Sequence, residues 1–329
     1  PPAKAQEIIS AGDVPLGTQG NLFGITGGEG TGKSNYVAAI VAGCICPAGA
    51  EVDTLGIQIT ANGRHKAVLL YDTEQSEVQL FKNVSNLLAR AKQPDKPDEL
   101  KAFCLTGMSR KERLNAIVQS MDKFYYQYGG IQLVVIDGIA DLVKSANDEA
   151  ESVAVIDELY RLAGIYNTCI LCVLHFVPNG LKLRGHLGSE LQRKAATILS
   201  IEKDDEPAQS VVKALKVRDG SPLDVPLMLF AWDKEAGMHV YKGEKPREEK
   251  EKRKERELVN VAHDIFGRQT RITYIDLCEQ LQQVLDIKER TAKSYIRFMR
   301  ERDIITKDTA NQSCFVIGSY HLQRNASCP

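Results

Sequence analysis

The chain has 329 residues with a formal net charge of −1, of which 43% are hydrophobic and 26% charged. This is the profile of a soluble globular protein long enough for two domains. No apolar run approaches the ~18 residues that cross a bilayer, and Pro1–Lys4 lack the apolar stretch of a signal peptide. We therefore expect a cytoplasmic protein with no membrane partner.

Apolar β-rich runs alternate with longer helical or polar stretches up to about Tyr241. This alternation predicts an α/β domain over residues 1–241, with a mostly parallel sheet covered by helices on both faces. Two later runs alternate with turns, which predicts an antiparallel extension of the sheet. The expected strands are Leu22–Thr26, Ala67–Tyr71, Leu133–Ile136, Cys169–His175 and Ile198–Ile201, followed by Val211–Val217 and Leu227–Ala231.

Among the eight cysteines, Cys169 and Cys172 have a spacing that metal and redox sites use. They lie in a continuous apolar run typical of a buried parallel strand. Residues three apart on a strand point to opposite faces, so the pair cannot chelate one ion. We expect both thiols to be reduced and packed in the core.

The segment 242–257 contains no Ala, Val, Ile, Leu, Met, Cys or aromatic residue. It has nothing to bury in a core, so we expect a linker or a solvated helix supported by i,i+4 ion pairs. The domain boundary is therefore predicted here. The chain is also more basic beyond it, because residues 1–241 carry 24 basic and 29 acidic groups and residues 242–329 carry 18 and 14.

Residues 258–329 carry the pattern of a small winged-helix domain: a helix ended by Gly267, a strand and second helix from Ile272, and a hairpin from Asp303. Arg290–Arg302 is the candidate recognition helix, and Lys288–Arg302 has six basic and two acidic residues. Such a helix is suited to face phosphates, although the same module also serves as a protein-docking domain. The residues predicted to contact DNA here are Arg290, Lys293, Ser294 and Arg297.

A phosphate-binding loop is predicted between the first expected strand and a helix, because Gly27–Ser34 fits G-x-x-x-x-G-K-[ST] without a mismatch. The backbone N–H groups of such a loop surround phosphates, and Lys33 would meet the β and γ phosphates. We therefore expect ATP and Mg²⁺ as cofactors. The predicted nucleotide contacts are Gly27, Gly28, Glu29, Gly30, Thr31, Gly32, Lys33, Ser34 and Asn35.

Acidic residues follow two further strands. Asp137 comes directly after Leu133–Ile136, which is a Walker B pattern, so Ser34 and Asp137 are the expected magnesium ligands. Asp137 could instead cap a helix or shape a turn, and Asp141 is a weaker candidate. Asp72 and Glu74 emerge at the carboxyl end of another strand, where open α/β sheets present their ligands.

The order of phosphate loop, Asp-Thr-Glu segment and Walker B strand resembles the RecA-type ATPases. In that family a Glu after the second strand is the catalytic base, which implies this role for Glu74, unless Glu74 merely caps the next helix. His175, at the end of the next strand, resembles the sensor of hexameric helicases similar to plasmid RepA. The alternative is a structural histidine.

The resemblance also implies that the Gly-rich stretch Pro178–Ser189 is a mobile surface loop contacting single-stranded DNA through Lys182, Arg184 and His186. A solvated loop without a partner is the alternative. Lys216 and Arg218 resemble the Lys-x-Arg hairpin with which DnaB-type helicases reach a neighbouring subunit's nucleotide. They could instead be solvated charges at an exposed strand end.

The resemblance spans roughly residues 15–241 and implies a DNA-dependent ATPase. We expect a homo-oligomeric, ring-forming helicase or translocase in replication or mobile-element maintenance. The chain departs from the simplest helicases of this kind by its C-terminal extension. The alternative is an ATP-switched DNA-binding regulator or recombination accessory factor without unwinding activity. A small-molecule kinase is disfavoured, since no segment resembles a lid with an arginine cluster.

Overall fold

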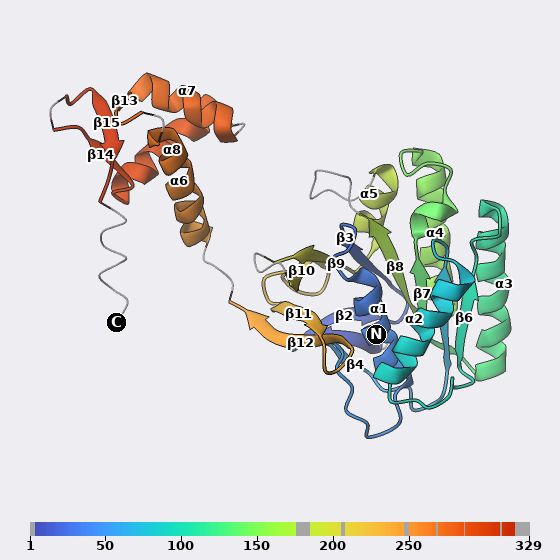
Figure 1. Cartoon of the computed structure of the whole chain (residues 1–329). Coiled ribbons are helices and arrows are strands. Elements are labelled where there is room, and N and C mark those ends of the chain that lie inside the picture. Colours follow the sequence, from blue (N-terminus) through green and yellow to red (C-terminus); the bar gives the residue numbers. More distant parts are fainter. Residues whose placement is uncertain are drawn as a thin grey trace. The chain divides into compact units, whose positions relative to one another are not determined.

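The computed structural model describes residues 4–175, 185–204, 208–246, 250–267, 269–285, 287–309 and 311–319 (Figure 1). The chain divides into two compact units, Pro1–Lys245 and Pro246–Pro329, and each is described by itself. No helix in these ranges is both long and apolar enough to span a membrane.

The first unit is built on a nine-stranded sheet in the order β12-β11-β10-β9-β3-β8-β7-β5-β6. From β9 to β6 neighbouring strands are parallel, and β10 to β12 continue the sheet antiparallel. The mostly parallel sheet and its antiparallel extension confirm the predicted α/β class. The strands are β3 (Leu22–Gly27), β5 (Ala67–Asp72), β6 (Leu100–Cys104), β7 (Ile131–Asp137), β8 (Cys169–His175), β9 (Thr197–Lys203), β10 (Gln209–Val217), β11 (Leu227–Asp233) and β12 (Met238–Lys245).

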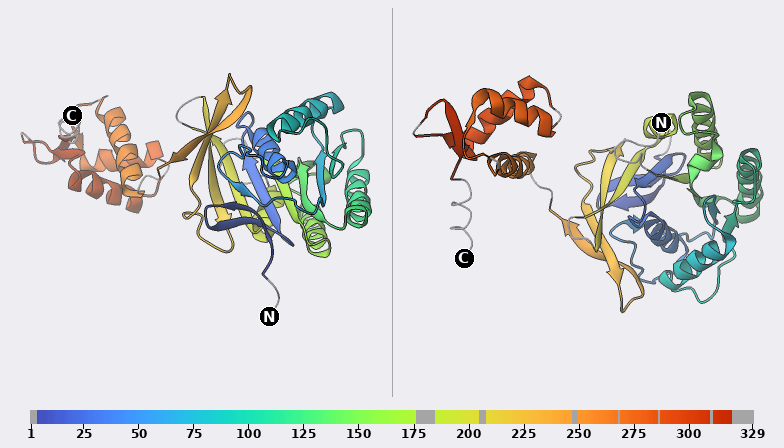
Figure 2. Two further views of the ribbon diagram at one scale, coloured as in Figure 1. Left: turned by 90° about the horizontal axis from the view of Figure 1, so that it is seen from below. Right: turned by 45° about the horizontal axis from the view of Figure 1, so that its top comes forward.

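Helices cover both faces of this sheet (Figure 2). One buried cluster joins the sheet to α1 (Lys33–Ile45) and α2 (Glu77–Arg90). The other joins it to α3, η1, α4 and α5. Cys169 packs in the first cluster and Cys172 in the second, which confirms that they point to opposite faces. The helices of the second face are α3 (Arg110–Tyr128), η1 (Ile139–Leu142), α4 (Glu149–Ile165) and α5 (Gly185–Lys194).

A second, three-stranded sheet has the order β2 (Val14–Thr18), β1 (Glu7–Ala11) and β4 (Gln58–Ile59). The sequence analysis predicted neither this sheet nor β6. All four strands are short, so each offers too few alternating side chains to stand out from a loop.

The structure corrects the predicted domain boundary. β12 continues through Lys245, four residues past the predicted end of the domain at 241. It pairs with β11 down to Leu227, with a bulge at Lys242. An edge strand is held by backbone hydrogen bonds and needs no apolar side chains, which explains why composition misplaced its end. The rest of the predicted linker falls largely within α6 (Lys250–Phe266), so residue 258 lies inside a helix.

Over its described residues, the second unit contains three helices and a small sheet of order β13-β15-β14. Its core is formed by residues from all three helices and from the sheet, among them Leu258, Leu281, Ile296 and Phe315. Besides α6, the elements are β13 (Ile272–Thr273), α7 (Tyr274–Leu285), α8 (Glu289–Glu301), β14 (Ile305–Lys307) and β15 (Cys314–Ile317).

Candidate functional site

The predicted phosphate loop connects β3 to α1. Gly32 has φ of +95°, and a Cβ at this position would lie 2.8 Å from Cε2 of Phe230, so only glycine fits. The Lys33 side chain is buried, and its Nζ donates to the carbonyl oxygens of Gly27 at 3.0 Å and Gly28 at 2.6 Å. Burial lowers the pKa of Lys33, while nearby carboxylates, first among them Asp137, oppose that shift.

The remaining predicted nucleotide contacts surround this lysine. Thr31 is buried, and its hydroxyl donates to the carbonyl oxygen of Gly28 at 3.0 Å. Ser34 and Asn35 are exposed on the first turn of α1, whose free N–H groups and dipole favour an anion. Glu29 and Gly30 are also exposed. The loop therefore presents an open, anion-favouring cradle at the carboxyl edge of the sheet.

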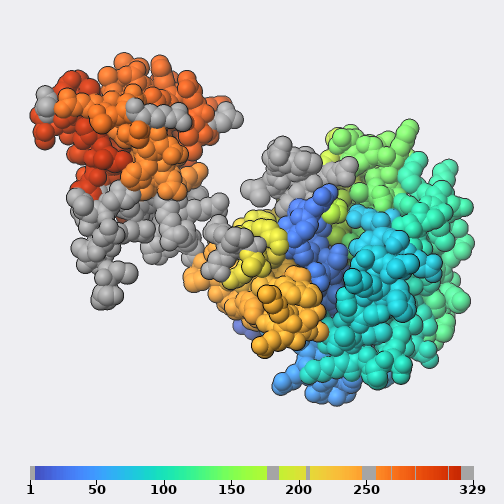
Figure 3. Space-filling view, viewed as in Figure 1, coloured from blue at the N-terminus to red at the C-terminus, as the bar shows by residue number. Residues whose placement is uncertain are grey.

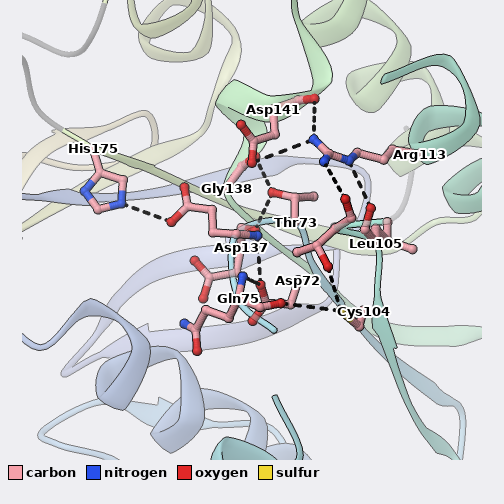
Figure 4. A network of polar contacts seen from close by, with 12 residues as sticks. Asp72, Thr73, Gln75, Cys104, Leu105, Arg113, Asp137, Gly138, Asp141 and His175 are labelled. Carbon is pink, nitrogen blue, oxygen red and sulfur yellow. Dashed lines mark hydrogen bonds and ion pairs between the residues drawn. The ribbon is translucent and has the colours of Figure 1, made fainter. Parts of the chain in front are cut away.

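Asp72 and Asp137 lie at paired positions at the ends of the neighbouring strands β5 and β7 (Figure 4). Asp72 is buried, and its Oδ1 accepts from the backbone N–H of Glu74 at 3.0 Å and of Gln75 at 2.8 Å. It therefore shapes the turn that follows β5. Burial raises its pKa, and these backbone hydrogen bonds oppose the rise.

Glu74 and His175 come together from two separate strand ends. Glu74 Oε2 lies 3.3 Å from His175 Nε2, and both side chains are about one-third exposed, 35% and 32%. Glu74 does not cap α2, because Ser76 does so through a hydrogen bond from the Gln79 N–H. Glu74 is therefore partly exposed beside His175 and is not used as the cap of α2.

Thr73 ties the turn after β5 to the end of β7. Its buried hydroxyl donates to the carbonyl oxygens of Asp137 at 3.0 Å and Gly138 at 2.8 Å, and its backbone N–H donates to Asp137 as well. Gly138 has φ of +97°, and a Cβ there would lie 2.4 Å from Oγ1 of Thr73. The positions of Glu74 and Asp137 are therefore fixed relative to each other by contacts that the sequence analysis missed.

Arg113 is a second residue that the sequence analysis missed. Its guanidinium donates to the carbonyl oxygens of Leu105, Thr106 and Asp141, and so joins the loop after β6 to the turn after β7. It also lies 3.8 Å from the Asp141 carboxylate. This ion pair makes Asp141 less suitable as a magnesium ligand.

The carboxyl edge is a site of concentrated negative charge. Burial, together with the neighbouring Asp72 and Glu74, raises the pKa of Asp137 to about 7. A cation would relieve this repulsion, and the Ser34 hydroxyl and the Asp137 carboxylate are hard oxygen donors of the kind Mg²⁺ prefers. In the described ranges no group of three or more His, Cys, Asp or Glu forms a complete metal site.

Lys216 and Arg218 lie at the opposite edge of the sheet from the phosphate loop. Val217 pairs with Thr197 at the start of β9, whereas Gly27 pairs with Ile201 near its end. Lys216 Nζ donates to two carbonyl oxygens at the end of α5, and Arg218 Nη2 donates to a third. The structure therefore does not bring this pair to the chain's own site.

The residues predicted to contact DNA fall into three groups. Lys182 and Arg184 lie outside the described residues. The predicted loop 178–189 is corrected at its end, because α5 begins at Gly185 and its buried leucines pack in the core; His186 is exposed on this helix. In the second unit four predicted residues are exposed on α8: Arg290, Lys293, Ser294 and Arg297.

Residues 1–179 match the model of a protein family described as AAA domain. The matched segment contains the phosphate loop, Glu74, Asp137 and His175. A search of curated proteins gives no match. Because the family model covers more than half of the 329 residues, the chain belongs to this AAA domain family of P-loop ATPases.

Proposed function

We propose that this protein is a DNA-dependent ATPase that acts as a ring on single-stranded DNA, as a helicase or translocase. The observation that carries the ATPase part is the meeting of Lys33, Glu74 and Asp137 at one edge of the sheet. The resemblance to hexameric helicases supports the DNA part and a role in replication or mobile-element maintenance.

Each residue of the site has a chemical role in this proposal. Lys33 would exchange its two carbonyl acceptors for the β and γ phosphates of ATP. Mg²⁺, held through Ser34 and Asp137, would neutralise phosphate charge. Glu74 would orient the attacking water and accept its proton. His175, which contacts that carboxylate, would link hydrolysis to the segment that follows β8.

The position of Lys216 and Arg218 supports a homo-oligomer. Both lie at the edge of the sheet remote from the chain's own phosphate loop, so they could assist hydrolysis only at a neighbouring subunit's nucleotide. An arginine supplied in trans stabilises charge on the transferring phosphoryl group.

The second unit supports contact with DNA. We assign it as a winged helix from its order of helices and strands, with α8 as the recognition helix and β14–β15 as the wing. A hollow of about 460 Å³ lies between α8 and β14, and it is lined by Arg297, Arg300, Glu301, Ile305, Thr306 and Lys307. Three cations around one hollow suit a backbone phosphate.

The first test is the steady-state rate of ATP hydrolysis with and without single-stranded DNA, at low salt, across protein concentrations. Strong stimulation that rises cooperatively with concentration is expected. Slow hydrolysis that single-stranded DNA does not stimulate would favour the second candidate, an ATP-switched regulator. In that candidate the basic α8 would select duplex DNA. Directional unwinding of a forked duplex would support the first candidate, and sequence-selective duplex binding the second.

A mixing experiment tests the ring. Subunits carrying Arg218→Ala keep Glu74, and subunits carrying Glu74→Gln keep Arg218. Mixed assemblies are expected to regain part of the activity that each variant lacks alone. No recovery at any mixing ratio would contradict action in trans.

A further inference from the structure

Trp232, the one tryptophan of the chain, is 56% exposed near the end of β11. Tryptophan is enriched at binding surfaces, because it combines a large apolar ring with an N–H that can donate a hydrogen bond. The described contacts place it in an aromatic group that extends from the phosphate loop. None of the residues that we assign a role in hydrolysis belongs to this aromatic group.

Phe230 is the link between the loop and this aromatic group. It lies against Gly32, and its ring centre is 5.8 Å from that of Tyr36 on the first turn of α1. Residues two apart on a strand share a face, so Trp232 lies on the same face of β11 as Phe230. Figure 3 shows the blue segment with the phosphate loop and α1 beside the yellow and orange strands β10 to β12.

The direction of β11 places Trp232 toward the nucleotide edge. β9 is parallel to β3, and β11 is separated from β9 by two antiparallel pairings, so it runs in the same direction as both. Trp232 follows Phe230 along this direction. It therefore lies beyond Phe230 toward the carboxyl edge, where the phosphate loop is also found.

His239 completes the group from the neighbouring strand. It pairs with Trp232 across β11 and β12, and its ring centre lies 5.5 Å from that of Trp232 and 5.7 Å from that of Phe230. Its Nδ1 is buried and has no hydrogen-bond partner among the residues that the structure describes. A buried ring nitrogen without a partner is rare, and because it is closed to solvent, a base edge would pair with it only after the His239 ring turns toward Trp232.

We propose that Trp232 and His239 form the nucleobase subsite of the phosphate loop, with a purine stacked on the indole and its edge hydrogen-bonded to His239. A base has an aromatic face that stacks on tryptophan, and a ring nitrogen of histidine can pair with its polar edge. The ligand class is a purine nucleoside di- or triphosphate. This inference rests on the proposed binding of a nucleotide at Lys33.

Because Trp232 is the one tryptophan, intrinsic fluorescence reports on this position directly. The probes are ADP and inorganic tripolyphosphate, which carries phosphates but no base. ADP is expected to quench or shift the emission, and tripolyphosphate to leave it unchanged. Equal changes with both probes, or none with ADP, would overturn the subsite.

Affinities measured by calorimetry complete the test. Trp232→Ala should weaken ADP binding by about 10-fold and leave tripolyphosphate binding unchanged, whereas Trp232→Phe should stay within about 3-fold of the parent. Leu223→Ala, which removes another exposed apolar side chain, is the matched control and should change neither affinity.

The two hypotheses fail differently. Unchanged ADP affinity in Trp232→Ala, with tight binding still lost in Lys33→Ala, would overturn the subsite and leave the phosphate loop in place. Unchanged affinity for both probes in Lys33→Ala would overturn the phosphate site itself.

Discussion

Two charged regions of this molecule are built in opposite ways. At the carboxyl edge of the first sheet, acidic side chains and Lys33 are held by buried strand ends and by contacts between them. On α8 of the second unit, the cations stand on one exposed helix face. There Lys293 pairs with Glu289 at 2.7 Å and Arg297 with Glu301 at 2.8 Å, each one helical turn away.

The difference shows what each arrangement can do. The carboxylates crowded at the partly buried edge repel one another and favour a bound cation, and Lys33 favours phosphates. Such strongly perturbed charges suit catalysis. Charges on an exposed helix are screened and interact weakly with many partners, which suits positioning on a polyanion. Substitutions in the first region should therefore have large, specific effects, and those on α8 should have small, salt-dependent ones.

The largest effect is expected for Glu74→Gln. Loss of the base should reduce kcat for ATP by about 10²–10³-fold with ATP affinity nearly unchanged, because glutamine keeps the shape of glutamate but cannot accept the proton of the attacking water. Single-turnover kinetics together with equilibrium binding would separate the two quantities. Glu77→Gln, at the start of α2, is the matched control. Turnover close to that of the parent would move the base role away from Glu74.

Lys33→Ala should weaken nucleotide binding by about 100-fold, since a buried ammonium that meets phosphates contributes several kcal/mol. Calorimetric titration with ADP would measure the change. Lys82→Ala, an exposed cation on α2, should bind like the parent. Equal affinity in Lys33→Ala and Lys82→Ala would contradict the site.

The Thr73 contact can be tested with two conservative changes. Thr73→Val keeps the shape but loses the hydroxyl that holds the turn after β5 against β7, and should lower kcat by about 10-fold with unchanged nucleotide affinity. Thr73→Ser keeps the hydroxyl and should retain most of the rate. If serine and valine lower the rate equally, packing of the methyl group is responsible instead.

Asp137→Asn should reveal the electrostatic strain of the carboxyl edge. The folded-state pKa of about 7 exceeds the ordinary 3.8, so ionisation destabilises the fold and stability falls as pH rises from about 4 through 7. Without Mg²⁺, the variant should therefore gain about 2 kcal/mol over the parent between pH 5 and pH 8. Urea unfolding in a chelator measures this. A pH-independent difference between variant and parent would contradict it.

The smallest effects are expected on α8. Arg297→Ala should weaken duplex binding by about 3-fold. It should also reduce the slope of log binding constant against log salt concentration by roughly one, because one fewer counterion is released. Glu301→Gln should strengthen binding slightly. Filter binding across salt concentrations measures both, with Arg161→Ala of the first unit as control. If α8 docks a protein instead, neither change on α8 will alter DNA affinity.

The sequence allowed the phosphate loop and the strand-end acids to be predicted because each is a local pattern beside an apolar run. The approach of His175 to Glu74 follows from strand order, which the alternation of strands and helices already constrains. The Thr73 and Arg113 contacts could not be predicted. They depend on which carbonyl oxygens face each other across segments some tens of residues apart, and this is set by strand register and loop shape.

The same limit applies to Phe230 and to the boundary at Lys245. Phe230 reads as one more apolar residue of a strand, and only the folding of β11 over α1 brings it against Gly32. β12 lacks apolar runs because its stability comes from backbone pairing with β11. Composition is informative where burial decides the structure and much less so at an edge.

β12 also has a consequence for solubility and assembly. It is the outermost strand of its sheet, where another strand could pair, but its outer row is partly occupied: the His239 carbonyl oxygen accepts from Arg90, and the Tyr241 N–H donates to Asp53. The bulge at Lys242, the charge of Lys245 and the following Pro246 all oppose such pairing. This edge is therefore protected against fibril-like growth, and subunits that associate would be expected to meet through side-chain surfaces rather than through a shared sheet.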